Sequence, residues 1–225
     1  MDHDVLRQAP LFSALDDESM TALRASMAET KLRRGDVLFH EGDTGDKLYV
    51  VLDGKVKLGR TSSDGRENLL AIMGPGQMFG ELSLFDPGPR SATVTAVTDA
   101  AFASLSHEDL LKWLDGRPIV ARGLLTQLAG RLRKANDVVA DLVFSDVPGR
   151  VAKALLDLAD RFGRTADDGV HVHHDLTQEE LAQLVGASRE TVNKALADFA
   201  SRGWLRLEPR SVVIMDIERM ARRAR

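Results

Sequence analysis

Apolar residues at helical spacing open the chain. Met20, Leu23 and Met27 recur every three or four residues behind Asp16 and Asp17, two side chains suited to cap a helix. The first thirty residues are therefore predicted to form short helices.

From Gly35 to about Leu105 the pattern changes to short β-rich runs. These runs cover residues 37–39, 48–52, 55–58, 68–73 and 93–97, with glycines between them. In the third run, Lys-Val-Lys-Leu, polar and apolar side chains alternate, as they do in a strand with one solvated face. Short strands with turn signals about every eight to twelve residues predict an all-β sandwich or barrel.

A long helix with a heptad pattern follows. Helical spacing starts near Glu108 and resumes after Pro118. Within it, apolar residues alternate in steps of three and four: Leu125, Leu128, Leu132, Ala135, Val139 and Leu142. Packing on the helix's own domain and a parallel coiled coil between two subunits both explain this seam. Its strict spacing over about three heptads favours a dimer.

Pro148 and Gly149 interrupt this helix, because the two residues together cannot continue it. Residues 145–149 are therefore predicted to be a hinge between domains. A second amphipathic helix is expected over residues 150–162.

Two further helices are joined by a short turn. Thr177 and Glu180 have the spacing of a capping box at the start of the first of them. Residues 185–188, which include a glycine, lead into the second helix, from Arg189 to about Ser201. This is the pattern of a helix-turn-helix unit, and a strand–turn–strand unit follows over residues 204–215.

Composition narrows the class of protein. Charged residues make up 28% and the hydrophobic class 44%, which excludes a disordered chain, a collagen-like repeat and a multispan membrane protein. The longest apolar runs, such as residues 48–52, are far shorter than the roughly twenty residues that span a bilayer. The start of the chain lacks a secretory signal pattern, so we expect a cytoplasmic protein without membrane association.

The chain has no cysteine, which excludes disulfides, thiolate nucleophiles and cysteine-ligated zinc or iron–sulfur centres. Its net charge is −4. Residues 189–225, however, hold nine basic and five acidic side chains, so this end is positive and the remainder more strongly negative. A basic end on an acidic body indicates an anionic partner for that end, although solvated surface charge also explains such counts.

The second helix of the helix-turn-helix carries side chains suited to DNA. The N-terminal residues of such a helix face base edges in the major groove. Arg189 can bind guanine O6 and N7, Glu190 can accept from cytosine N4, and Lys194 can reach guanine or phosphate. An ordinary helical pair with solvated charges is the alternative. The basic hairpin behind it, which looks like a wing, weakens that alternative: Arg202, Arg206 and Arg210.

A second motif, residues 79–85, lies just before Arg90. Gly80 permits close approach of a backbone, and Glu81 can accept from a ribose hydroxyl. Arg90 presents two aligned donors that match a phosphate, and free N–H groups of a short helix starting at Glu81 would suit an anion. A simple salt bridge between Glu81 and Arg90 is the alternative.

These motifs resemble a known family. Residues 42–54, 79–84 and 90–94 resemble the cyclic-nucleotide-binding β-roll, and residues 176–192 resemble the winged helix of the cAMP receptor protein (CRP/FNR) family. The resemblance covers nearly the whole chain in the family's domain order. Residues 146–150 and 193–199 are most similar to actinobacterial members.

The resemblance implies an α+β fold of four parts. They are an N-terminal antiparallel β-roll of the double-stranded β-helix (jelly-roll) type at residues 1–116, a long dimerisation helix at 117–144, a hinge at 145–149 and a winged helix-turn-helix at 150–225.

The function implied is that of a homodimeric transcription factor, not an enzyme, in which cAMP is an allosteric ligand. It implies palindromic operator DNA with GTG/CAC-type half-sites, RNA polymerase as a candidate partner, and neither a prosthetic group nor a metal. The resemblance assigns cyclic-nucleotide contacts to Gly80, Glu81, Leu82, Ser83, Arg90, Ser91, Ala135 and Asn136. It assigns DNA contacts to Thr177, Gln178, Ser188, Arg189, Glu190, Thr191, Asn193 and Lys194.

One position departs from the family pattern. Ala135 stands where a hydroxyl residue commonly contacts the adenine amino group, and the loss of such a hydrogen bond costs about 1 kcal/mol. A regulator of the same architecture with another effector, or with none, is therefore an alternative. An enzyme regulatory subunit that uses only the roll is a second alternative, against which the helix-turn-helix speaks.

Three histidines form a local cluster, His171, His173 and His174. Alternation along a strand would place only the first two on one face, so an exposed strand is expected, with a metal site as the alternative. Trp113 and Trp204 are expected to be packing residues.

Overall fold

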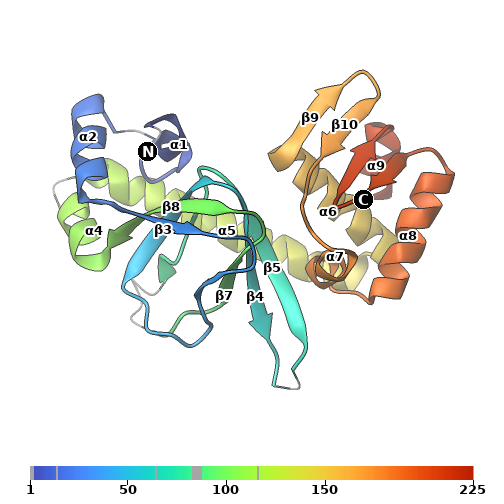
Figure 1. Cartoon of the computed structure of the whole chain (residues 1–225), viewed down its shortest axis with the longest axis horizontal. Coiled ribbons are helices and arrows are strands. Elements are labelled where there is room, and N and C mark those ends of the chain that lie inside the picture. Colours follow the sequence, from blue (N-terminus) through green and yellow to red (C-terminus); the bar gives the residue numbers. More distant parts are fainter. Residues whose placement is uncertain (1–2, 14, 64, 83–87, 116, 225) are drawn as a thin grey trace. The chain divides into compact units, whose positions relative to one another are not determined.

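The computed structural model describes residues 3–13, 15–63, 65–82, 88–115 and 117–224. It divides into two compact units, Met1–Thr61 with Leu70–Lys134, and Ser62–Leu69 with Ala135–Arg225. Helix α5 (Pro118–Phe144) contributes to both (Figure 1).

Two four-stranded antiparallel sheets form the N-terminal β-roll. One has the strand order β1 (Ala28–Leu32), β8 (Ala100–Ser106), β3 (Lys47–Asp53), β6 (Met78–Phe79). The other has the order β2 (Val37–Phe39), β7 (Thr93–Ala96), β4 (Val56–Thr61), β5 (Glu67–Met73). Val51, Val56, Phe79, Val94 and Phe102, from strands of both sheets, form one buried cluster, so the sheets face each other across an apolar core.

Four helices flank the roll: α1 (His3–Gln8), α2 (Asp17–Ser26), α4 (His107–Leu114) and the first part of α5. Asp16 caps α2 by accepting a hydrogen bond from the Ser19 amide at 2.7 Å, as its sequence predicts. The helix ends at Ser26, so Met27 is its C-cap residue rather than part of the helical stripe. Pro118 starts α5, where a missing N–H is harmless.

Three strands of the roll escape prediction. Strand β1 has the sequence Ala-Glu-Thr-Lys-Leu, in which four of five residues favour helices, and β8 is rich in alanine. They form because β8 lies between β1 and β3 and hydrogen-bonds both. Strand β6 has only two residues, and its pairing with β3 places Phe79 opposite Tyr49. This pairing brings the next residues, Gly80 and Glu81, to the end of the sheet.

The second unit is a winged helix-turn-helix. Its helices are α6 (Val147–Phe162), α7 (Gln178–Val185), α8 (Arg189–Ser201) and α9 (Ile217–Arg223). Its sheet has the order β11 (Leu205–Glu208), β12 (Ser211–Ile214), β10 (Gly169–Val172), β9 (Gly163–Ala166). Val151, Leu155, Leu181, Val192 and Phe199, from four helices, and Val212 of the sheet share one core. Trp204 packs against this core and Trp113 lies in the core of the roll, so both tryptophans are packing residues.

The break between α5 and α6 is shorter than the sequence predicts. Only Ser145 and Asp146 are non-helical, and the expected helix at 150–162 begins three residues earlier, at Val147. Proline is tolerated here because Pro148 lies in the first turn of α6, and Asp146 caps that turn by accepting from the Gly149 amide at 2.9 Å.

The histidine cluster is not an exposed strand. Strand β10 ends at Val172, and His174 is buried at 5% exposure, where its Nδ1 accepts a hydrogen bond from the Leu176 amide. Among the residues that the structure describes, no group of three His, Cys, Asp or Glu side chains could hold a metal ion.

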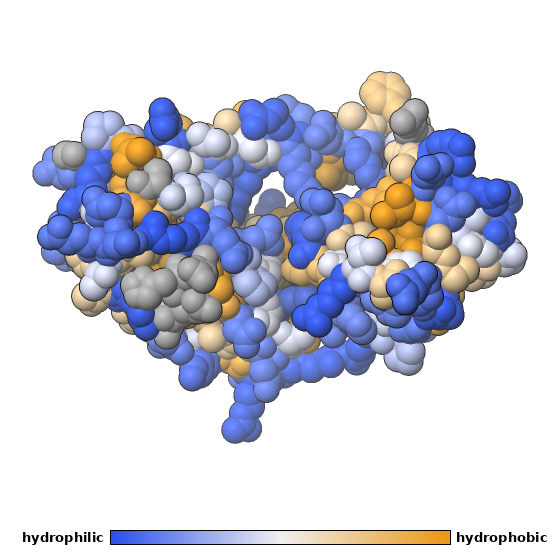
Figure 2. Space-filling model, turned by 90° about the horizontal axis from the view of Figure 1, so that it is seen from above, coloured by the Kyte–Doolittle hydropathy of each residue, from blue (hydrophilic) through white to orange (hydrophobic). Residues whose placement is uncertain are grey.

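Hydrophilic side chains cover most of the molecular face seen in Figure 2, interrupted by small apolar patches. No helix within the described ranges is both long enough and apolar enough to cross a membrane.

Candidate functional site

Glu81 is fully buried at the end of β6, although it is a carboxylate. Gly80, just before it, has a φ of +82°. A Cβ atom at Gly80 would lie 2.8 Å from Arg90 Nη1 and 3.0 Å from the Lys47 carbonyl oxygen. Only glycine combines this left-handed backbone with so close an approach, so Gly80 brings Glu81 next to Arg90.

Arg90 is also buried, at 4% exposure. Its Nη1 donates to the Gly80 carbonyl at 2.9 Å, and its Cζ lies 4.3 Å from the centroid of the Phe39 ring and 5.7 Å from that of Tyr49. Burial lowers the pKa of the guanidinium, while Tyr49 and nearby acidic groups act in the opposite direction. The Nε atom of Arg90 has no hydrogen-bond partner among the described residues.

Arg131 of α5 is the partner of Glu81, and sequence reasoning missed it. Its Nη1 donates to Glu81 Oε1 and its Nη2 donates to the Met78 carbonyl. The other carboxylate oxygen, Glu81 Oε2, is buried without a partner in the described part of the chain. The salt bridge between Glu81 and Arg90 that the sequence left open is therefore wrong, because Glu81 pairs with Arg131. Only its position on the roll-facing side of α5, next to the partly buried Leu128, could have indicated Arg131.

The structure places the other expected nucleotide contacts less closely. Leu82 is 52% exposed and Ser91 is exposed, while Ser83 lies outside the described residues. Ala135 and Asn136 are exposed on α5, in the second unit. The described residues that come together within the roll are therefore Gly80, Glu81 and Arg90, with Arg131 added by α5.

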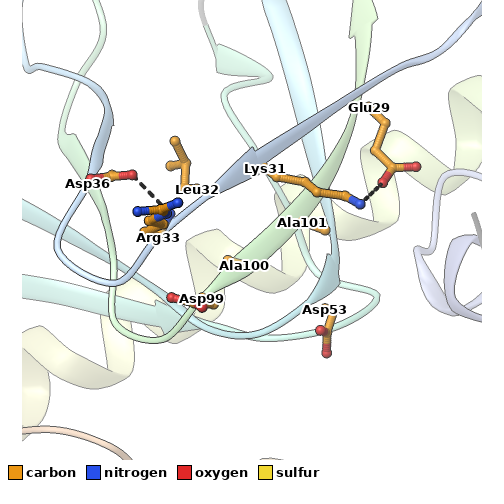
Figure 3. A pocket seen from close by; sticks show the side chains of 9 residues that line it. All are labelled: Glu29, Lys31, Leu32, Arg33, Asp36, Asp53, Asp99, Ala100 and Ala101. Carbon is orange, nitrogen blue, oxygen red and sulfur yellow. Dashed lines mark hydrogen bonds and ion pairs between the residues drawn. The ribbon is translucent and has the colours of Figure 1, made fainter.

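A surface hollow elsewhere on the roll is a second concave region (Figure 3). It is lined by Glu29, Lys31, Leu32, Arg33, Asp36, Asp53, Asp99, Ala100 and Ala101. Several of its charged groups already bind one another: Lys31 pairs with Glu29 at 3.5 Å, and Asp36 accepts from the Arg33 amide at 2.9 Å. None of the residues expected to contact nucleotide lines it.

The helix-turn-helix is built largely by local hydrogen bonds. Thr177 and Glu180 form the predicted capping box, with distances of 2.8 and 3.1 Å between each side chain and the other residue's amide. Gly186 ends α7 with a φ of 68°, a conformation that favours glycine. Ser188 caps α8 by accepting from the Thr191 amide at 3.2 Å, and its hydroxyl also bonds that of Thr191. The cap hydroxyls therefore position α8, while its side chains remain available.

The start of α8 presents an exposed polar face. The exposed residues of the predicted DNA set are Thr177, Gln178, Ser188, Arg189, Glu190, Thr191 and Lys194. Lys194 Nζ pairs with Glu190 Oε1 at 2.7 Å, one helical turn apart. Asn193 is half-buried, and its Oδ1 has no partner among the described residues. Val192 and Leu196 are buried on the opposite side, which fixes the face that α8 presents.

The wing is less available than its basic residues suggest. Arg206 pairs with Asp168 at 2.8 Å and with Glu208 at 3.2 Å. Hydrogen bonds from His171 and then from Arg206 lower the pKa of Asp168 to about 2. Arg202 pairs with Asp198 at 2.8 Å. Arg210, in the two-residue turn between β11 and β12, adopts a φ of 57°, which is uncommon for a residue other than glycine.

The heptad seam of α5 is mostly exposed on the single chain. Leu125 is 65% exposed, Leu132 64%, Val139 60% and Leu142 52%, and Ala135 is exposed as well. Leu128 differs, because it packs against the core of the roll. The alternative in which the whole seam packs on its own domain is therefore wrong.

Comparison with known proteins agrees with this architecture. Residues 29–117 match the cyclic nucleotide-binding domain, and residues 149–223 match the Crp-like helix-turn-helix domain. Over 222 residues, 99% of each chain, the protein is 54% identical to a CRP-like cAMP-activated global transcriptional regulator of Mycobacterium tuberculosis. Over 211 residues, 94% of each chain, it is 38% identical to the cyclic AMP receptor protein of Thermus thermophilus.

Solved structures give the same picture. The N-terminal domain of a transcriptional regulator from Streptomyces coelicolor A3(2) is 64% identical, covers 64% of this chain and 99% of its own, and has a TM-score of 0.51. The c-di-GMP responsive global regulator CLP of Xanthomonas campestris is 26% identical, with a TM-score of 0.76 over 88% of this chain and 99% of its own.

The two domain matches define a DNA-binding transcriptional regulator with a cyclic nucleotide-binding domain. The chain belongs to the cAMP receptor protein (CRP/FNR) family. Its relatives are regulators rather than enzymes.

Substituting Arg131→Met leaves the buried Glu81 without its donor. We expect the free energy of unfolding to fall by about 1–3 kcal/mol, the usual penalty for a buried polar group that loses its partner. Arg133→Met is the matched control, since Arg133 is exposed on the same helix, and it should change stability by less than about 0.5 kcal/mol. Urea unfolding of the two variants measures this difference, and equal losses would contradict the pairing.

Proposed function

We propose that this protein is a cAMP-responsive transcription factor. It acts in the cytoplasm as a homodimer that binds palindromic operators with GTG/CAC-type half-sites, and cAMP in the roll controls the orientation of the DNA-binding domains. RNA polymerase is its expected partner at promoters. Support comes from the full-length similarity to cAMP-activated regulators and from the side chains described above.

The observation that carries the nucleotide part is a pair of buried, incompletely bonded ionic groups. Glu81 Oε2 and Arg90 Nε are both buried without partners among the described residues. Buried polar groups are nearly always hydrogen-bonded, so two such atoms so close together favour a polar ligand. A carboxylate suits a ribose hydroxyl and a guanidinium suits a phosphate, which are the two polar parts of a cyclic nucleotide that do not depend on the base.

The base is recognised by a different part of the chain in this proposal. Asn136 is exposed on α5 and would reach adenine from the partner subunit, next to Ala135. Because Ala135 has no hydroxyl, it offers one hydrogen bond fewer to the purine, which favours weaker discrimination among nucleotides. One neighbour in structure is titled a c-di-GMP responsive regulator, so c-di-GMP belongs in the titration beside cAMP and cGMP.

The exposed seam of α5 supports the homodimer. Four large apolar side chains at heptad spacing, each more than half exposed, would face water on an isolated chain: Leu125, Leu132, Val139 and Leu142. A second copy of the helix buries such residues as knobs in holes. Burial of each large aliphatic side chain contributes about 1.5–3 kcal/mol, which is enough to favour a coiled coil.

Removing the Arg90 charge should abolish cAMP binding without unfolding the roll. In calorimetry, the wild-type protein should bind cAMP, while Arg90→Ala and the shape-preserving Arg90→Gln should show no heat of binding. Arg33→Ala, an exposed arginine in the hollow of Figure 3, is the control and should bind as wild type does. Unchanged affinity in both Arg90 variants would refute the phosphate assignment, and loss in Arg33→Ala alone would place the nucleotide in the hollow.

A charge on the seam should separate the subunits. Leu132→Glu places two like charges at a two-fold interface, which is strongly unfavourable. Leu132 is chosen over Leu128 because Leu128 also packs in its own roll, where a charge would disturb the fold. Sedimentation should give monomers for Leu132→Glu and dimers for Arg133→Glu, the off-seam control. A dimeric Leu132→Glu would mean that the subunits meet elsewhere.

Ligand and operator should tighten each other's binding. A two-fold dimer engages two half-sites when its recognition helices are about 34 Å apart, one turn of B-DNA. We expect saturating cAMP to tighten binding to a GTG/CAC palindrome by roughly 5–150-fold, towards the lower end because Ala135 lacks a hydroxyl. By reciprocity, calorimetry with operator present must show the same factor for cAMP. Equal operator affinity with and without cAMP would identify a constitutive binder.

A further inference from the structure

The link between α5 and α6 is held by side chains from three other places in its own unit. The link consists of Ser145 and Asp146, the two residues between the helices. Both use their polar groups fully: the Ser145 amide donates to the Asp141 carbonyl at 2.9 Å, and the Asp146 side chain caps α6. A flexible hinge would leave such groups to solvent.

Arg150 bonds the end of α5 to the turn of the helix-turn-helix. Its Nη1 donates to the Ser145 carbonyl at 2.8 Å, its Nε to the Val185 carbonyl at 3.1 Å and its Nη2 to the Gly186 carbonyl at 3.3 Å. These carbonyls lie where α5 and α7 end, so their own helices offer them no donor. A planar guanidinium with donors on three nitrogens can bind all three carbonyls at once, whereas an ammonium cannot.

Two ion pairs hold the same link from other sides. Arg223 of α9 donates from Nη2 to Asp146 Oδ2 at 2.6 Å, and this bond is the main reason that the pKa of Asp146 is lowered. Lys153 of α6 pairs with Asp141 of α5 at 2.6 Å. Met220, fully buried in the core, anchors α9 itself. The link is therefore connected to α5, α6, α7 and α9.

A direct apolar contact adds to these bonds. A Cβ atom at Gly186 would lie 3.3 Å from Leu142 Cδ2, so the last turn of α5 touches the turn that precedes the recognition helix. Gly186 is two residues before Ser188, which caps α8. Whatever moves the end of α5 therefore acts within a few residues of the DNA-contacting side chains.

We propose that the α5–α6 link is a clamped elbow rather than a hinge, and that Arg150 is the positioning residue that makes the helix-turn-helix follow the end of α5. The inference rests on the proposed function for its role in ligand response, but the clamp itself is a property of the second unit. It assigns the coupling between nucleotide and DNA to a rigid connection, so bending at residues 145–149 is not part of the response.

Hydrogen exchange tests the clamp without any ligand response. In wild type, the amides of Ser145 and Arg150 should exchange slowly and at equal rates with and without cAMP. Arg150→Met and Arg150→Lys should raise these rates roughly tenfold or more, because the link then opens locally. Arg222→Met is the control, since Arg222 is exposed on α9 beside Arg223 and should leave the rates unchanged. Unprotected amides in wild type, or unchanged rates in both Arg150 variants, would overturn the clamp.

Operator binding then tests the positioning role. In the same Arg150 variants, the factor by which cAMP tightens operator binding should fall by at least about threefold. The affinity for cAMP without DNA should stay as in wild type, because Arg150 lies outside the nucleotide site. An unaltered coupling factor, or a loss of operator affinity that is equal with and without cAMP, would overturn the positioning role and leave Arg150 merely structural. A wild-type protein without coupling but with a protected link would refute the proposed ligand response and not the clamp.

Discussion

The burial of two opposite charges, Glu81 and Arg90, is the constraint on which the roll depends. Removing an ionised group from water costs several kcal/mol unless it is bonded. The roll offsets this cost with the Gly80 carbonyl and two aromatic faces for Arg90, and with Arg131 for Glu81. Phe39, Tyr49 and Gly80 therefore have a purpose beyond filling the core: they keep a positive charge buried beside a carboxylate. A site so arranged is ready for a polar anion, and it also explains why so small a strand as β6 matters.

The second unit relies on hydrogen bonds to helix ends. Ser188, Thr177 and Asp146 each cap a helix with a side-chain oxygen, while Arg150 binds carbonyls where two helices finish. Because helix ends carry unpaired backbone groups, a few polar side chains can fix several helices relative to one another. The start of α8 thus has a defined position while the side chains of Arg189 and Lys194 are exposed. The same economy is absent from the roll, where sheet pairing and apolar burial hold the strands.

Availability for DNA differs among the basic residues for the same electrostatic reason. Arg206 and Arg202 are already paired with acidic neighbours, whereas the strained backbone of Arg210 keeps it in the turn of the wing. Counting charges along the C-terminal region would give these arginines equal weight. In the structure, ion pairing within the wing reduces the number of cations that can meet a phosphate backbone without first breaking a bond.

The sequence by itself determined the local features. The capping box at Thr177, the glycine turn at Gly186, the bounds of α8 and the proline start of α5 were all predictable, because their hydrogen bonds join residues within four positions of each other. The heptad spacing of α5 was predictable for the same reason. The family resemblance, carried by two long motifs, then gave the fold class and the order of the domains.

Tertiary structure alone decided the features that join distant residues. The pairing of Arg131 with Glu81 spans fifty positions, and Arg150 reaches Val185 and Gly186 across thirty-five and thirty-six. Strand β1 forms from helix-favouring residues because β8 supplies its hydrogen bonds, and His174 is buried by packing that its neighbours in sequence do not reveal. Such contacts depend on which surfaces the folded chain brings together, and a pattern along the chain reports only spacing between near neighbours.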